Sequence, residues 1–245
     1  MEILNDNELH LKFLLRQSVY VDGLGYFHSP TLEEIINMTE SKYNESISAL
    51  LFDKSNLEIN NEEIDNYTNF QVLSSLVYND DHFRKAYFNC LKLHFNKEPK
   101  IQEDGYVYFD ELSEDTVITE EKFDYIKRLV RIANHIAEKK NDDFNAGNAK
   151  ARKFLKKLKE KEARLAKYKK SNSNLHSIIS AVGWKTQDFV SINNLNIYQL
   201  YDGYSRFHVL DNYHYTMSGI YAGTVDGSKI KTEDIDWANI LNTKN

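Results

Sequence analysis

The stretch TEEKFDYIKRLVRIANHI, residues 119–136, decides the fold class. Thr119 stands where a helix N-cap is expected, and the two glutamates after it favour the positive end of a helix dipole. Apolar residues recur at helical spacing and form one inner face, which consists of Phe123, Ile126, Leu129, Val130, Ala133 and Ile136. The segment predicts an amphipathic helix that buries one side, and hence a mainly α protein.

Helical periodicity also appears on both sides of this stretch. Thr31 precedes Glu34 by three residues, the spacing of a capping box, and Asp80 or Asp81 is placed to cap another helix. With only 2 Pro and 9 Gly, long helices meet few breakers. We expect helices over residues 32–51, 66–78, 81–95, 175–182, 196–207, 210–222 and 233–241, the last one carrying Trp237.

Two short segments are strand-like. Residues 18–28, SVYVDGLGYFH, place β-branched and aromatic residues on both sides of an Asp-Gly turn, which predicts a hairpin. Residues 105–109 and 116–119 have similar composition, and we expect them to pair with each other. The sequence therefore predicts a helical protein with two small β elements.

A change in charge divides the chain. After the turn formers of residues 140–148, residues 150–170 hold 11 Lys or Arg against 2 Glu, a net charge of +9. The rest of the chain has 20 basic and 35 acidic residues, or −15, so charge is strongly segregated. We expect an exposed basic helix with Phe154, Leu158 and Leu165 on its inner stripe. The expected division of the chain is a helical N-terminal domain with small β-hairpins (1–140), a basic linker helix (141–172) and a small C-terminal helical domain (173–245).

Motifs that would name a reaction are absent from the sequence, which lacks a phosphate loop, a dinucleotide fingerprint, a nucleophile elbow and a His-Glu-x-x-His zinc site. Cys90, the single cysteine, is interpreted as a small core residue. His135 and Glu138 have the spacing of a helical metal pair, but histidines that face solvent or form hydrogen bonds are the favoured interpretation. We therefore expect no enzyme activity, cofactor or metal.

A cluster of carboxylates is the other candidate for a metal site. Its members are Asp110, Glu111, Glu114 and Asp115. A calcium loop of the EF-hand type needs a central Gly and a terminal Glu at fixed positions, and this cluster has neither. A solvated acidic turn is the better interpretation.

Aromatic residues are dense after residue 197, and five of them are candidate partner-binding residues: Tyr198, Tyr201, Tyr204, Phe207 and Tyr213. An aromatic residue at helical spacing usually belongs to a core. As a set, however, they exceed what one small core takes, and Tyr is favoured at binding surfaces. Asp202 and Arg206, four residues apart, are expected to form an ion pair within this helix.

The compartment and the partners follow from the same features. An acidic N-terminal stretch, one cysteine and the lack of a long apolar run indicate a cytoplasmic protein without a membrane span. The basic segment alone would suit phosphates, but the acidic chain lacks a base-reading motif. Nucleic acid therefore ranks below protein as a partner, and a membrane surface ranks lower still.

Several motifs together resemble a family. They are VDGLGY at 21–26, SPTLEEI at 29–35, LHSIISAV at 175–182 and NIYQLYD at 196–202. They look like phage and prophage tail assembly chaperones of low-GC Gram-positive bacteria. That resemblance implies a late protein of the host cytoplasm, without catalytic residues, that binds the tape measure protein and/or the tail tube protein. Alternatives are a structural tail or baseplate component, a nucleic-acid-binding regulator that uses the basic helix, and an enzyme with an unfamiliar site.

Overall fold

The structure is a computed structural model that describes residues 3–56, 66–103, 105–137 and 174–238. The basic helix expected over 150–170, with Phe154, Leu158 and Leu165, lies outside these residues. The described helices are α1 (Asp6–Leu14), α2 (Leu32–Met38), α3 (Glu40–Leu50), η1 (Lys54–Asn56), α5 (Asn69–Asn79), α6 (Asp81–Phe95), α7 (Glu120–Ala133), α9 (Leu175–Thr186), α10 (Phe189–Ile192), α11 (Ile197–Tyr221), η2 (Gly227–Lys229) and α12 (Thr232–Ile235).

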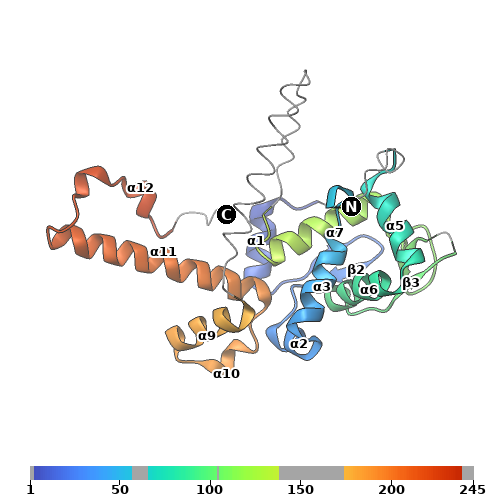
Figure 1. Cartoon of the computed structure of the whole chain (residues 1–245), viewed down its shortest axis with the longest axis horizontal. Helices are drawn as coiled ribbons and strands as arrows, with labels where there is room; N and C mark the ends of the chain where they lie inside the picture. The colour runs from blue at the N-terminus through green and yellow to red at the C-terminus, as the bar shows by residue number, and fades with distance from the viewer. Residues whose placement is uncertain (1–2, 57–65, 104, 138–173, 239–245) are drawn as a thin grey trace, which may run out of the picture.

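The N-terminal body is built around α6, against which α3 and α5 pack (Figure 1). Asp80 caps α6 by accepting hydrogen bonds from the backbone N–H groups of His82 and Phe83. Cys90 on this helix is fully buried, as predicted for a core residue, and burial strongly raises the pKa of its thiol. A thiol with a raised pKa is a poor nucleophile, which agrees with a structural role.

The amphipathic helix that decided the fold class forms as predicted. Thr119 caps α7, and Phe123, Ile126 and Leu129 are buried in the core. Lys127 on the same helix is buried too, and its ammonium group donates to the carbonyl of Phe52 at the end of α3. Ile136, predicted on the inner face, lies beyond the helix end and is exposed.

Both β elements are two-stranded antiparallel hairpins, β1 (Val19–Val21) with β2 (Gly25–Phe27), and β3 (Pro99–Ile101) with β4 (Val107–Phe109). The first is as predicted. The expected pairing of 105–109 with 116–119 is confirmed only as an isolated antiparallel bridge between Tyr108 and Val117. The ladder partner of β4 is β3, which was not predicted. Pro99 hides this partner in the sequence, since proline lacks a ladder donor.

Three predicted helix boundaries are also corrected. The helix over 32–51 breaks at Thr39, which has φ 81°. The helices over 196–207 and 210–222 are the single helix α11, because no Gly or Pro separates them. Instead of a helix over 233–241, α12 ends at Ile235 and Trp237 follows it.

The break at Thr39 has a tertiary cause. The first turn of α2 is tied to the chain just before α11, since the N–H groups of Leu32 and Glu33 donate to the carbonyls of Leu195 and Asn193. Helix α3 instead lies along α6. One straight helix cannot satisfy both, so Thr39 adopts a left-handed backbone that a β-branched residue disfavours.

Replacing Thr39 with glycine should relieve this strain. We expect Thr39→Gly to raise the free energy of unfolding by about 1 kcal/mol, because glycine adopts positive φ without a Cβ penalty. Thr39→Ala is the control, since it keeps the Cβ and should bring no gain. Urea unfolding of the three proteins measures the difference. A Thr39→Gly variant no more stable than Thr39→Ala would contradict a strained break.

Candidate interaction surface

Asn196 fixes the start of α11 to the N-terminal body. Its side-chain oxygen accepts from the N–H of Gln199 at 2.7 Å, which caps the helix, and its Nδ2 donates to the carbonyl of Phe13 at 2.8 Å. The backbone N–H of Ile197 donates to the carbonyl of Pro30, also at 2.8 Å. Asn196 is buried. The end of α1 and the start of α2 are therefore held together by the first turn of α11.

Beside this anchor, His10, His135 and Tyr198 pack from three different helical regions. The ring centroids of His135 and Tyr198 lie 4.6 Å apart, and Nδ1 of His10 lies 3.1 Å from the Tyr198 hydroxyl. Burial lowers the pKa of His135 to about 4, although the charge of Asp202 opposes the shift. Burial also lowers the pKa of His10 and raises that of Tyr198 to about 12. The cluster is thus built for neutral side chains.

The five candidate partner-binding residues take three different positions on α11. Tyr198 is 4% exposed, so it belongs to the core. Tyr201, Tyr204 and Phe207 are half-buried and pack against that core. Tyr213 is half-buried further along the helix. Of the five, Tyr213 is therefore the residue farthest from the anchor, and Tyr198 is out of a partner's reach.

Helix α9 supports the middle of α11. The Lys185 ammonium contacts both carboxylate oxygens of Asp211, at 2.6 and 2.8 Å, and lies 5.9 Å from the ring centre of Phe207. The ring of Phe189 on α10 rests on Gly183, where a Cβ would come within 2.3 Å of a ring carbon. A small residue at 183 therefore allows α10 to fold back against α9.

Beyond this support α11 continues as an arm, defined here as residues 208–238. No residue of α11 after Leu200 is buried, and Figure 1 shows the helix extending well past the N-terminal body. Tyr215 is 77% exposed and Tyr221 is 83% exposed. The chain then returns along the helix through η2 and α12.

Arg206 joins the returning segment to the helix. Its Nη1 donates to the carbonyl of Trp237 at 2.8 Å. This contact holds the C-terminal segment against α11. The ion pair expected between Asp202 and Arg206 stays a prediction. The arm is therefore a short antiparallel unit whose outer aromatic residues face solvent.

A second exposed apolar group lies on α9 and α10. Trp184 and Val190 are 73% and 86% exposed, and the Trp184 ring meets that of Phe189 edge to face with centroids 5.3 Å apart. Large exposed apolar side chains that gather in one region indicate an interaction surface. The periodicity of the sequence did not point to these residues. The one signal that could have located this surface is Trp184, a large apolar residue near the end of α9.

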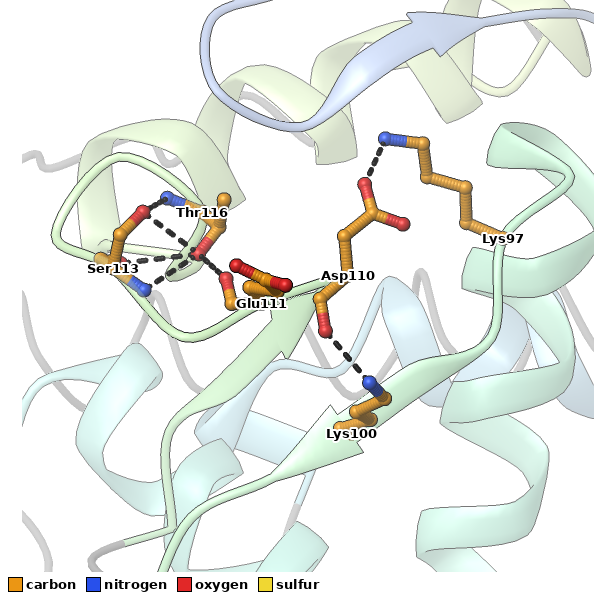
Figure 2. Close-up of polar contacts among 6 residues, drawn as sticks. All are labelled: Lys97, Lys100, Asp110, Glu111, Ser113 and Thr116. Atoms are coloured by element: carbon orange, nitrogen blue, oxygen red, sulfur yellow. Dashed lines mark hydrogen bonds and ion pairs between the residues drawn. The ribbon is translucent and has the colours of Figure 1, made fainter.

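The acidic turn at 110–116 is closed by lysines and by its own hydroxyls (Figure 2). The Lys97 ammonium lies 2.6 Å from Oδ2 of Asp110, and Lys100 donates to the Asp110 carbonyl at the same distance. Thr116 donates its hydroxyl to the carbonyl of Glu111 at 2.6 Å. Among the described residues, no group of three or more His, Cys, Asp or Glu is arranged to hold a metal ion. The geometry supports a solvated turn.

Comparison with known proteins gives one match. Residues 167–242 match the family model described as the YomV second domain, so this part of the chain is similar to a domain of a phage-related protein. The match spans α9, α10 and the whole arm. Searches of the curated proteins and of the solved structures gave no significant match. Within the described part of the chain, no helix is both long and apolar enough to cross a membrane.

The half-buried His135 predicts how acid affects the anchor of α11. The pKa of His135 is about 4 in the folded protein and near 6.5 in the unfolded chain, so the unfolded state binds more protons between these values. The free energy of unfolding should therefore fall as pH drops from 6.5 to 4, by at most about 3 kcal/mol from this residue. Above pH 6.5 the effect vanishes.

His135→Asn isolates this contribution, because Asn tolerates the φ of 53° found at this position and does not titrate. His94, which is buried and has a pKa of about 4, titrates in the same window in both proteins and cancels in the comparison. Urea unfolding at pH 7.5 and pH 4.5 measures the loss. Equal losses of stability in the wild type and the variant would contradict a His135 that is neutral in the folded protein.

Proposed function

We propose that this phage-related protein acts as a tail assembly chaperone that binds the tape measure protein and/or the tail tube protein, with the arm as its binding surface. The observation that carries the proposal is the course of α11. The helix is anchored by a buried first turn, yet it presents Tyr215 and Tyr221 to solvent far from the body.

Physical considerations support a protein partner. Aromatic side chains contribute large contact areas at a small cost in rotamer entropy, and Tyr and Trp are enriched where binding energy concentrates. The arm and the α9–α10 group together expose Trp184, Val190, Tyr215, Tyr221 and Trp237. A partner that is helical and rich in apolar stripes would bury these side chains.

The assignment to tail assembly rests on two supports. The motifs at both ends of the chain resemble tail assembly chaperones, and the region that matches the YomV second domain contains the whole proposed surface. The proposal assigns no catalytic residue and no cofactor. A protein partner is favoured over nucleic acid, because the chain is acidic overall and lacks a base-reading motif.

A pull-down with the tape measure and tail tube proteins encoded beside this chain tests the proposal. The double variant Tyr215→Ser with Tyr221→Ser should weaken capture at least about tenfold, since removing a central aromatic contact commonly costs more than 1 kcal/mol. Both residues are exposed, so the variant should keep its fold, which circular dichroism checks.

The matched control is Tyr20→Ser with Tyr26→Ser, on the N-terminal hairpin. These two tyrosines are also exposed, at 54% and 66%, but they lie outside the arm. The control should capture the partner as the wild type does. If the arm variant and the control bind equally well, the arm is not the binding surface. If the wild type captures neither protein, the proposed partners are wrong.

Mass spectrometry of purified particles separates an assembly factor from a structural component of the tail. A chaperone acts before the tail is complete, so its peptides should be absent from finished particles while remaining abundant in the lysate. Peptides present in stoichiometric amounts with tail proteins would instead favour the structural alternative.

A further inference from the structure

An aromatic cleft lies on the N-terminal body, away from the proposed binding surface. It has a volume of about 340 Å³ and is formed by α5 together with Glu103 and Tyr106, which lie between β3 and β4. Its lining residues are Phe70, Gln71, Ser74, Ser75, Tyr78, Asn79, Glu103 and Tyr106. Gly105 allows the turn to approach α5 closely, because a Cβ there would lie 3.3 Å from the Ser74 carbonyl oxygen.

Three aromatic rings shape the cleft. Phe70 is buried and is held from behind by Phe123, with ring centroids 5.5 Å apart. The ring of Tyr106 lies 6.2 Å from that of Phe70 and is tilted by 39°, and about half of the Tyr78 side chain is exposed. The cleft therefore offers the faces and edges of rings that come from two separate elements.

Among the described residues that line the cleft, Glu103 is the one carboxylate, and none is a lysine, arginine or histidine. The nearby Arg84 donates hydrogen bonds to the carbonyls of Val77 and Tyr78, and its charge is paired with Asp81. Aromatic faces attract cations within about 6 Å of the ring centre, and an adjacent carboxylate adds to that attraction.

We propose that this cleft binds an organic cation, either a quaternary ammonium group or the guanidinium of an arginine side chain. The alkyl part of the ligand would rest on Phe70, the charge would lie between the rings of Tyr78 and Tyr106, and the Glu103 carboxylate would neutralise it. The polar side chains of Gln71, Ser74 and Asn79 at the rim would bond any hydroxyl or amide attached to the cation. The volume accommodates a ligand of this size.

Titrations of the full chain with two matched ligand pairs test the proposal. Choline is compared with 3,3-dimethylbutan-1-ol, its neutral isostere, and N-acetylarginine amide is compared with N-acetylcitrulline amide. Backbone amide NMR signals of residues 70–79 and of Gly105 report binding. At least one cation should give saturable shifts confined to these residues, and its neutral partner should bind roughly tenfold more weakly. The pair that responds identifies the kind of cation.

Two variants connect binding to the cleft. Glu103→Gln and Tyr106→Leu should each weaken the cation roughly fivefold, while Tyr26→Leu on the N-terminal hairpin should leave binding unchanged. Glu103 is exposed, so its variant should fold normally even if Tyr106→Leu does not. The absence of saturable shifts with both cations, equal binding of a cation and its isostere, or insensitivity to Glu103→Gln would each overturn the proposal.

Discussion

The capping contact at Asn196 is the constraint on which the arrangement of the chain depends. One buried side chain both caps α11 and bonds the carbonyl of Phe13 at the end of α1. Losing this side chain would uncap a long helix, at a cost of about 1–2 kcal/mol. It would also remove the bond between α11 and the Phe13 carbonyl, which would still accept from the N–H of Arg16. The neighbouring bond from Ile197 to Pro30 fixes the same turn to the segment that leads into α2.

From this anchor α11 passes through three environments. Its first turn lies in the main core, with Ile197 and Leu200 fully buried. Its middle is covered on one side by α9 through Lys185 and Asp211, an exposed ion pair that orients more than it stabilises. Its outer part packs against the returning C-terminal segment, where Val225 lies close to Gly219. Local stability should therefore decrease along the helix, as expected where buried apolar contacts become fewer.

The parts of the fold that the sequence predicted well are those set by local signals. The cap at Thr119 and the apolar spacing of α7, the Asp-Gly hairpin, and the cap of α6 are as expected. The break at Thr39 was not predictable, because it depends on contacts between segments distant in the sequence. The pairing of β4 with β3 is local, but Pro99 hides β3 because proline lacks a ladder donor. The expected division into 1–140, 141–172 and 173–245 stays a prediction, although the described C-terminal helices share one buried cluster with the N-terminal ones.

The candidate surface shows the same limit. Aromatic density drew attention to α11, but spacing alone could not separate Tyr198, which lies in the core, from Tyr215 and Tyr221, which face solvent. That separation depends on where the body ends along α11, and the sequence holds no local signal for it. The exposed Trp184 and Val190 depend similarly on the close packing of Phe189 on Gly183.

Amide hydrogen exchange along α11 tests whether a firmly anchored helix extends into a sparsely packed arm. We expect protection near that of α6 for the amides of Leu200 to Tyr204. Protection should be lower by at least about tenfold for Tyr213 to Tyr221, where fewer buried contacts oppose opening. Addition of the partner should raise protection in the second group alone. Uniform protection along the whole helix, or weaker protection near Leu200 than near Tyr221, would contradict an anchored helix with a sparsely packed arm.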